Sequence, residues 1–513
     1  MTNKIRFVNS ILDNVHGFIG LTKVESEIER LPIFKRLQNI SQLGLTNRIF
    51  PCALHNRYTH SLGVMHIVDQ MAIQLGFDDD ERQLVRLAGM LHDIGHYPFS
   101  HDVEKAYKDY HESISESVAV GHNSDKKEKK LFLNGRDNPY HHEAIGSTII
   151  RHSAEITNIV AEHYVKDNPK FADKDPESVA NAILRDISYI ITGDIGEPDR
   201  PIFSEYFREK SDMMVQIMHS ELDADRFDYL LRDSTFSGTS YGSFDLSVLI
   251  RELTSTKDSK SGRYIVGILP SGIGCAEQFL LNRYFAYSQI IHHKDTAILG
   301  FALQSAVKLL LKSGKAIPGV SKGKTCADDI ISAAKKYESD PDSTFIKFTD
   351  AYLINCFTDD RFNCFTDDRC DEQASNLIHC IKRYMVPKME AELINVGINN
   401  NDATMNTHPL FQEYRASETN RGYIYLLRDV PLTSHKSQAE FDNETSEIIG
   451  ANEDSTTKES RRLDRLLDEL VVIDKDKDKD KEPILLIDSE QSMLRDIYKL
   501  RYRVVRKYSI PKL

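Results

Sequence analysis

The segment 92–101, HDIGHYPFSH, gathers three histidines and a carboxylate in ten residues. The adjacent His92 and Asp93 offer a nitrogen ligand beside an oxygen ligand, a mixture that suits Fe, Mn, Zn or Mg rather than a thiolate site. His96 and His101 follow within nine residues. A lone His-Asp pair is equally typical of a helix end with a capping carboxylate. The prediction of a metal site therefore depends on what else in the chain can complete it.

The elements that must position these residues are amphipathic helices. Residues 61–75 and 81–92 carry apolar side chains three or four positions apart, which predicts two packed helices. His60 then stands at the start of the first helix, and His92 and Asp93 lie at the end of the second. An antiparallel arrangement of the two helices would bring His60 close to that pair.

A third helix can supply a further carboxylate. Residues 212–233 read as one long helix whose apolar pattern is interrupted by aspartates. Carboxylates within a core-directed helix are costly unless they are paired or bind a metal, although they could also simply face solvent. With Asp225 included, the candidate ligands are two imidazoles and two carboxylates, which leave coordination positions open for water and substrate. They are His60, His92, Asp93 and Asp225.

Cations and further histidines accompany this set. Guanidinium and ammonium groups suit phosphate oxygens, and the candidates are Arg57, Arg226, Arg283 and Lys294. Histidines with an unperturbed pKa near ~6.5 can carry protons, and the candidates are His96, His101 and His142. These residue types indicate a catalytic rather than a structural metal site, beside cations suited to phosphate oxygens.

Composition narrows the class of protein. A chain of 513 residues suggests two to four structural units, and 40% hydrophobic with 28% charged residues is ordinary for a soluble globular protein. The net charge of −13 argues against a broad nucleic-acid surface. No apolar run of 18 residues and no signal peptide are found, so we expect no membrane span and a cytoplasmic location.

The seven cysteines form no CxxC pair, which favours reduced thiols. A zinc site is a weaker alternative, and its ligands would be Cys364, Cys370, His379 and Cys380.

Six sequence blocks, in this order, resemble the HD-domain phosphohydrolase superfamily and its deoxynucleoside triphosphate (dNTP) triphosphohydrolase branch. The blocks are FKRLQNISQLG (34–44), HNRYTHSLGV (55–64), HDIGHYPFSH (92–101), HHE (141–143), LDADRFDYLLRD (222–233) and RYFAYSQIIHHK (283–294). The resemblance covers residues 5 to about 310. It implies a reaction in which water attacks the α-phosphorus and releases a deoxynucleoside and intact triphosphate.

The resemblance also implies a role for each matching residue. The four candidate ligands would hold one divalent metal ion, which could be Mn, Fe, Mg or Zn. Acid/base work would fall to His101 with His142 and Glu104. The phosphates would be contacted by His96, Arg57, Arg226, Arg283 and Lys294. The sugar would be contacted by Tyr229 and by Asp233, which would meet the 3′-hydroxyl, and Gln42 and Leu43 would lie by the sugar or base.

Two positions depart from the family pattern. Ile291 stands where relatives have a tyrosine that rejects ribose, and an apolar pocket rejects an added hydroxyl only about 10²-fold. Selection of deoxyribose over ribose is therefore open. Arg30, Lys35 and Gln38 replace the residues that read a guanine activator, so activation by GTP is not supported. Another dNTP activator, or none, stays open.

The resemblance predicts a mainly α fold, in which residues 1–312 form an HD-domain helical core and residues 313–513 a smaller α+β region. Residues 102–140 are polar and are expected to form a solvated insertion. Further helices are expected at 23–43, 141–151, 175–192, 273–312 and 489–506. Strands are expected at 250–269, which would be the first β segment, and at 421–432 and 483–488. Charged loops are expected at 433–462 and 474–482, and the tandem octad at 355–370 has no assigned function.

Other functions fit part of the same pattern. Another HD phosphohydrolase could act on a signalling nucleotide or a nucleic-acid end, and a non-enzymatic protein could sense a nucleotide and control a partner. The resemblance favours a homo-oligomer (dimer, tetramer or hexamer) with nucleotides at subunit contacts. Control of nucleotide pools and depletion of dNTPs during phage infection both suit the predicted reaction.

Overall fold

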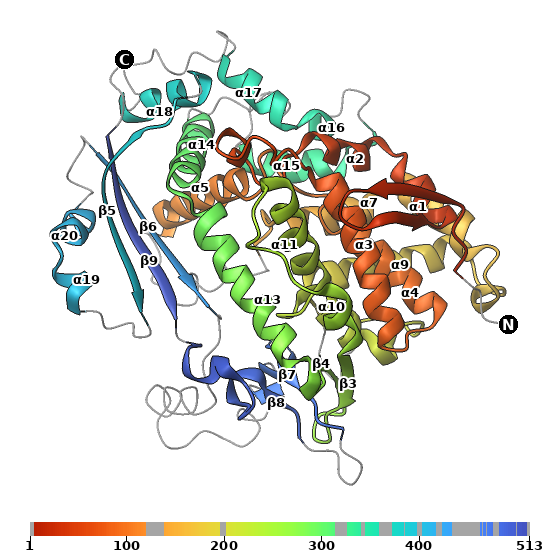
Figure 1. Ribbon diagram of the computed structural model, residues 1–513. Helices are drawn as coiled ribbons and strands as arrows, with labels where there is room; N and C mark the ends of the chain where they lie inside the picture. The colour runs from red at the N-terminus through yellow and green to blue at the C-terminus, as the bar shows by residue number, and fades with distance from the viewer. Residues whose placement is uncertain are drawn as a thin grey trace.

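The computed structural model of the chain is drawn in Figure 1. The structure describes residues 5–119, 138–194, 202–312, 326–339, 344–358, 372–383, 385–397, 403–416, 423–432, 462–463, 465–467, 469–475, 482–498 and 500–509. The fold is mainly α with a few small sheets, as predicted. None of the described helices has both the length and the hydropathy to cross a bilayer.

The described chain begins with a hairpin that the sequence analysis missed. Strands β1 (Asn9–Asp13) and β2 (Gly17–Leu21) pair antiparallel, so the segment at 250–269 is not the first β structure. The expected helical stretch at 23–43 forms α1 (Lys23–Glu29) and α2 (Pro32–Lys35). Proline is tolerated at a helix start but not inside a helix, which explains the break between them.

Helices α3 (Arg57–Gln74) and α4 (Asp79–Leu91) form the expected pair. The side chain of Asn56 caps α3, and a reciprocal capping box between Asp78 and Glu81 begins α4. The two helices pack side by side. The first residues of α3 therefore lie beside the last turn of α4, where the candidate ligands stand.

The expected insertion at 102–140 is wrong in its first part. Residues His101–Ala119 form helix α5, which packs against α14 (Lys294–Lys312). Val103, Ala106 and Tyr107 are fully buried on one face of α5. Their spacing of three and four residues puts them on one helix face, and their burial stabilises the helix. The many polar residues between them hide this pattern in the sequence. The remainder of the segment, 120–137, lies outside the described residues.

The next helices surround α3 and α4. They are α7 (His142–His152), α8 (Ala154–Val160), α9 (Pro176–Thr192), α10 (Ser211–His219), α11 (Ala224–Ser237) and α12 (Leu246–Arg251). The expected helices at 141–151 and 175–192 are confirmed. The single helix expected at 212–233 is wrong, because the chain is extended at Ser220 and Asp223 caps a new helix. That break places Asp225 in the first turn of α11.

A hairpin and a bent helical segment follow. Strands β3 (Leu253–Lys257) and β4 (Tyr264–Ile268) confirm the β segment at 250–269, and β7 (Val471–Val472) and β8 (Ile484–Leu485) extend their sheet. The long helix expected at 273–312 is divided into α13 (Ile273–Ala286) and α14. A π-helical turn, Tyr287–Ile291, separates them.

The C-terminal part is mixed, as expected. It contains α15 (Cys326–Lys335), α16 (Thr344–Lys347), α17 (Asp350–Thr358), α18 (Glu372–Arg383), α19 (Ala403–Thr407) and α20 (Pro409–Arg415). Strands β5 (Lys388–Gly397), β9 (Arg501–Ser509) and β6 (Tyr423–Pro431) form an antiparallel sheet in that order. This sheet stands apart from the α3–α4 pair in Figure 1.

Strand β9 corrects the helix expected at 489–506. Tyr502, Val504 and Tyr508 are buried on one face of β9. On the other face Arg501, Arg503 and Lys507 are partly exposed and Val505 is buried. This period-two pattern, rich in Tyr and Val, stabilises a strand between two partners. The strand expected at 421–432 is confirmed as β6. The one expected at 483–488 is confirmed only at Ile484–Leu485, since Leu486–Asp488 form a 3₁₀ turn.

Most of the predicted charged loops and of the octad lies outside the described residues, at 433–461, 476–481 and 359–371. So do Cys364 and Cys370 of the alternative zinc site. The main hydrophobic core includes residues from Ile19 to Tyr508, so the helical and C-terminal parts share it. The boundary near residue 312 stays a prediction.

Candidate metal centre and active site

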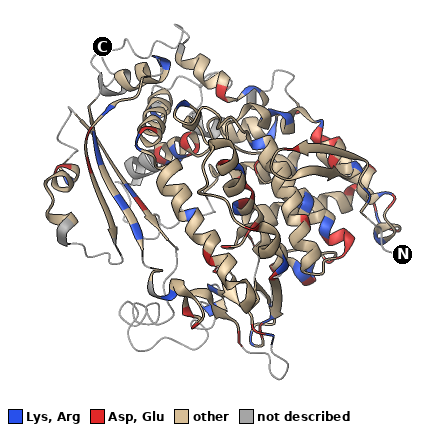
Figure 2. Ribbon diagram, in the orientation of Figure 1, with Lys and Arg blue, Asp and Glu red and all other residues tan. Residues whose placement is uncertain are grey.

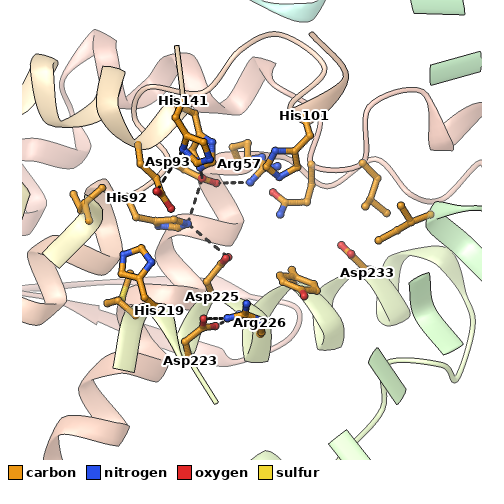
Figure 3. Close-up of a pocket in the computed structure, with 18 of the residues that line it drawn as sticks. Arg57, His92, Asp93, His101, His141, His219, Asp223, Asp225, Arg226 and Asp233 are labelled. Atoms are coloured by element: carbon orange, nitrogen blue, oxygen red, sulfur yellow. Dashed lines mark hydrogen bonds and ion pairs between the residues drawn. The ribbon is translucent and has the colours of Figure 1, made fainter. Parts of the chain in front are cut away.

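The four predicted ligands meet where α3, α4 and α11 converge. The rings of His60 and His92 lie 5.2 Å apart between centroids, which confirms the expected approach of the two helix ends. Asp225 Oδ1 lies 2.9 Å from His60 Nε2 and 3.8 Å from His92 Nε2. Asp93 reaches both imidazoles, at 3.3 Å from His92 Nε2 and 3.8 Å from His60 Nε2. Figure 3 shows His92 and Asp225 pointing toward one another.

These residues fit a divalent metal ion. The Nε2 atoms of His60 and His92 are buried, and among the described residues neither has a partner in hydrogen-bond geometry, although Asp225 Oδ1 lies 2.9 Å from His60 Nε2. Each ring uses Nδ1 instead, on Asp228 Oδ2 at 2.7 Å and on the Gly89 carbonyl at 2.8 Å. When Nδ1 donates its proton in this way, Nε2 presents a lone pair for a metal. His60, His92 and Asp225 place their ligand atoms within 4.8 Å of one another.

Both candidate carboxylates are held ionised. Burial alone would raise the pKa of Asp93, but the Arg57 guanidinium and the nearby imidazoles lower it below its usual range. Burial would also raise the pKa of Asp225, but the close approach and the charge of His60 lower that pKa below its usual range. Two anionic oxygens beside two imidazole nitrogens are a suitable donor set for Mn, Fe, Zn or Mg.

A second layer of polar side chains holds His60. Asp228 accepts from Arg232 Nε at 2.8 Å and lies 2.6 Å from His16 Nε2. Arg232 also donates to Asp13 at the end of β1, at 2.8 Å. The sequence analysis gave Asp228 no role of its own and counted it only among the aspartates that interrupt the 212–233 pattern. The available signal was its spacing, three residues after Asp225 and four before Arg232 on one helix face.

A histidine cluster adjoins the ligand set. His101 Nδ1 lies 2.9 Å from Glu104 Oε2, and His142 Nδ1 lies 3.3 Å from the same oxygen. The His96 ring stacks on His142 with 4.2 Å between centroids. Gly95 allows this approach, since a Cβ there would stand 2.2 Å from the His142 carbonyl oxygen. His101, with 67% of its side chain exposed, is the member of the cluster that can meet a ligand from solvent.

The histidines of the cluster differ in pKa. Burial lowers the pKa of His142, but the Glu104 carboxylate raises it more, so the net shift is upward. Burial and the positive charge of Arg57 together hold the pKa of His96 well below its usual range. Glu104 therefore favours the imidazolium form of His142, while His96 stays neutral.

A cavity of about 350 Å³ opens in front of these groups. Its walls include seven of the predicted substrate-binding residues, namely Gln42, Leu43, Arg57, Arg226, Tyr229, Asp233 and Ile291. The cavity is also lined by His92, Asp93, Asp225, His101 and His142. In Figure 3, Asp233 lies on the far side of Arg226 from His92.

Two cavity arginines are already anchored. Arg57 donates to Asp93 Oδ2 at 2.8 Å and to Ser100 Oγ at 2.9 Å. Arg226 pairs with Asp223, which also accepts from the Arg226 amide at 2.7 Å. Burial raises the pKa of Asp223 to about 7 in spite of this pairing. Because both arginines are pre-oriented, a bound anion would meet them with little rearrangement.

Three predicted phosphate contacts do not line the cavity. His96 is fully buried, stacks on His142 and is absent from the cavity walls. Arg283 donates to Glu221 at 2.7 Å, and it does not line the cavity. Lys294 is exposed at the first turn of α14 and is also absent from the cavity walls. The π-helical turn that ends at Ile291 directs this part of the chain differently from a continuous helix, although Ile291 itself reaches the cavity.

The sequence analysis did not assign a role to several polar residues at the site. His55 Nε2 lies 2.7 Å from Asp233 Oδ1 and orients that carboxylate. His219 lines the cavity while its Nε2 contacts the Ile190 carbonyl at 2.7 Å. His55 is the first residue of the HNRYTH block, which was a usable signal, whereas nothing in the sequence marks His219.

Comparison with known proteins bears on this site. Residues 57–232 match the family model of the HD domain, a span that includes all four candidate ligands. The chain therefore contains an HD domain, and its similarity extends to dNTP triphosphohydrolases. It is 28% identical over 290 residues to a protein of Bacillus subtilis, which covers 55% of this chain and 52% of that one. It is 42% identical over 98 residues to the human deoxynucleoside triphosphate triphosphohydrolase SAMHD1, covering 18% of this chain and 16% of that enzyme.

Solved structures share the fold of this chain. A protein from Aquifex aeolicus superposes with a TM-score of 0.62 at 21% identity, covering 98% of this chain and 96% of that one. At this identity the likeness shows the fold alone. By sequence, the chain spans about half the length of four curated relatives, between 49% and 56%. The HD-domain match and the similarity to dNTP triphosphohydrolases thus support a general HD-type hydrolase.

Proposed function

We propose that the protein is a metal-dependent dNTP triphosphohydrolase, which releases a deoxynucleoside and inorganic triphosphate. The observation that carries the proposal is the cavity that joins the two halves of such a site. Its lining includes the candidate ligands His92, Asp93 and Asp225 together with the predicted sugar contacts Tyr229 and Asp233. The similarity to the human dNTP triphosphohydrolase supports the same reaction.

A divalent metal ion held by His60, His92, Asp93 and Asp225 would supply a Lewis acid and activate water near neutral pH. Arg57 and Arg226, both on the cavity wall, would neutralise phosphate charge by planar, charge-assisted hydrogen bonds. Their pairing with Asp93 and Asp223 holds their guanidinium groups in place before the substrate arrives.

Proton transfer to the departing sugar oxygen is assigned to the histidine cluster. His101 is exposed to the cavity and hydrogen-bonded to Glu104, so its second ring nitrogen can face the substrate. Glu104 also raises the pKa of His142, which keeps a proton available next to His101. A histidine positioned by a carboxylate is a standard arrangement for general acid catalysis.

The nucleoside would occupy the side of the cavity formed by Tyr229, Asp233 and Ile291. The Tyr229 hydroxyl lies 3.5 Å from that of Tyr287, which also lines the cavity. The Asp233 carboxylate, oriented by His55, is suited to accept a hydrogen bond from the 3′-hydroxyl. Ile291 offers only bulk against a 2′-hydroxyl, so weak discrimination against ribonucleotides is expected.

The reaction is tested by product analysis. Purified protein is incubated with Mn²⁺ or Mg²⁺ and each dNTP or rNTP, singly and in mixtures, and the products are separated. Deoxynucleoside with inorganic triphosphate is the expected result, and stimulation in mixtures would reveal a nucleotide activator. Monophosphate with pyrophosphate would contradict the proposal and indicate another phosphohydrolase. Tight nucleotide binding with no turnover would instead favour a nucleotide sensor.

We also propose that the active protein is a homo-oligomer, as the resemblance to nucleotide-regulated relatives suggests. Light scattering coupled to size exclusion, with and without dNTPs, measures the mass directly. A single species of 58.6 kDa in all conditions would contradict this.

A further inference from the structure

Two consecutive residues beside the histidine cluster adopt an unusual backbone conformation. Phe99 and Ser100 have φ angles of 53° and 55°, and they are the only described residues other than glycine with positive φ. Side chains make this left-handed region unfavourable, and such a turn persists only where its surroundings hold it. The turn directly precedes His101, whose orientation therefore depends on it.

The group that holds this turn comes from the C-terminal part of the chain. Asp350, the first residue of α17, accepts from the Phe99 amide through Oδ1 at 2.6 Å. Its other oxygen, Oδ2, accepts from the Ser41 amide at 2.8 Å and from the Ser41 hydroxyl at 2.5 Å. One carboxylate thus joins two segments that are separated from it by 251 and 309 residues.

The Phe99–Ser100 turn and the Ser41 segment both adjoin the cavity, because His101 follows the first and Gln42 follows the second, and both residues line the cavity. Ser41 pairs with Asn56 in an isolated β-bridge and directly precedes Gln42 and Leu43, which line the cavity. The Ser41 carbonyl accepts from the Ser100 hydroxyl at 2.6 Å. A displacement of Ser41 would therefore move Gln42 and Leu43 on the cavity wall and break the hydrogen bond to Ser100 in the turn.

The connection continues to the metal ligands. The Ser100 hydroxyl that donates to Ser41 also accepts from Arg57 Nε at 2.9 Å. Arg57 in turn donates to Asp93 Oδ2 at 2.8 Å. Hydrogen bonds thus run without interruption from Asp350 through Ser41, Ser100 and Arg57 to a candidate ligand.

We propose that Asp350 is a positioning residue for the active site: it holds the Phe99–Ser100 turn and the Ser41 segment in the geometry that orients His101 and Arg57. The expected effect of Asp350 on turnover rests on the proposed function. Its expected effect on the Phe99–Ser100 turn and the Ser41 segment rests on the hydrogen bonds alone. It assigns to the C-terminal part of the chain a direct role in forming the catalytic centre.

The test compares Asp350→Ala and Asp350→Asn with a matched control, Glu338→Ala. Glu338 is also a carboxylate of the C-terminal part that accepts from backbone amides of the helical part, at Ala154 and Glu155, and none of these three residues lines the cavity. Hydrogen exchange is measured for peptides covering 38–44 and 95–101. Bound Mn²⁺ and turnover of each dNTP are measured on the same full-length preparations.

Asp350→Ala is expected to accelerate exchange in those two peptides and to lower kcat roughly 10- to 100-fold, the cost of about 1 Å of misplacement. Bound Mn²⁺ should fall by less than kcat, since Asp350 contacts none of the candidate ligands and reaches Asp93 only through Ser41, Ser100 and Arg57. Asp350→Asn keeps one acceptor oxygen and should lie between the wild type and Asp350→Ala. Glu338→Ala should leave both peptides and kcat unchanged.

Unchanged exchange at 38–44 and 95–101 in both Asp350 variants would overturn the proposal. A uniform acceleration across the whole chain would also overturn it, because that pattern indicates a general loss of stability. If the wild-type protein hydrolyses no dNTP, the proposed function fails, but the exchange comparison still decides whether Asp350 holds the turn.

Discussion

Two groups of ion pairs in this molecule use the same chemistry in different surroundings. Beneath the candidate metal site, Asp228 and Arg232 have fully buried side chains. On the β5–β9–β6 sheet, Asp429 pairs with Arg501 and Arg503, and between 23% and 33% of each of the three side chains is exposed. Figure 2 shows the cations of this sheet along its strands, away from the α3–α11 contact.

The comparison teaches that burial, rather than the number of ion pairs, decides how much free energy is lost when a pair is broken. Buried charges must be fully matched, because an unpaired one loses its hydration without replacement. Asp228 therefore needs every one of its partners, His16, His60 and Arg232, and a change to any of them reaches the metal ligand. Exposed pairs can separate into water at little cost. The following predictions test this difference, from the largest expected effect to the smallest.

Asp225→Asn is expected to remove the largest share of activity. It replaces an anionic ligand by a neutral amide, so bound Mn²⁺ should fall and kcat/KM should drop roughly 10³-fold or more, since several kcal/mol of charge stabilisation is lost. Metal analysis and dNTP turnover measure both effects. Asp245→Asn, at an exposed position before α12, is the control and should change neither. Full metal content in Asp225→Asn would exclude this residue as a ligand.

Gly63→Ala should disrupt the buried pair without removing a charge. A Cβ at this position would stand 1.8 Å from Asp228 Oδ1 and 2.6 Å from Arg232 Nη2, so the pair must move. We expect the free energy of unfolding to fall by about 3 kcal/mol or more, and metal affinity to fall about 10- to 100-fold as His60 loses its support.

Gly274→Ala is the matched control for this substitution. Gly274 lies in the first turn of α13, and nothing stands within 4 Å of an added Cβ. Alanine there should stabilise the protein by about 0.4–1 kcal/mol. Equal denaturation midpoints for the two variants would refute the account of Gly63.

Glu104→Gln should shift the dependence of kcat on pH. Burial lowers the pKa of His142, and Glu104 reverses this by favouring the imidazolium ion. Without the carboxylate the pKa of His142 falls, so the imidazolium form is lost at a lower pH. The alkaline limb of the kcat profile should therefore move toward acid pH. Glu162→Gln, a change on an exposed helical turn, should leave the profile in place, and an unmoved limb in Glu104→Gln would remove His142 from the proton-transfer step.

Asp429→Ala should have the smallest effect. The pairs with Arg501 and Arg503 are partly hydrated, so the free energy of unfolding should change by no more than about 1 kcal/mol, and less at high salt. Chemical denaturation at two salt concentrations measures this, and dNTP turnover should be unaffected. A loss as large as that of Gly63→Ala would contradict the comparison.

Local patterns in the sequence predicted most of the helical core. The apolar spacing in 61–75 and 81–92 placed His60 and His92 at adjoining helix ends, and the two rings lie 5.2 Å apart. Helix-capping residues such as Asp175 and Pro176 act within one turn, so the start of α9 was predictable. The errors arose where tertiary packing overrides local pattern, as at the break before Asp223 and in β9, which has a partner strand on each side.

The sequence by itself determined the chemical types at the site: two histidines and two aspartates at helix ends, cations for phosphate, and a histidine-rich turn. These features lie within single helices or short motifs, where spacing along the chain decides which side chains share a face. Only the tertiary structure decided which groups support them. Asp228 contacts His16 across 212 residues and Asp350 contacts Ser41 across 309. No local periodicity encodes such contacts, because they exist only after distant segments pack and lose contact with water.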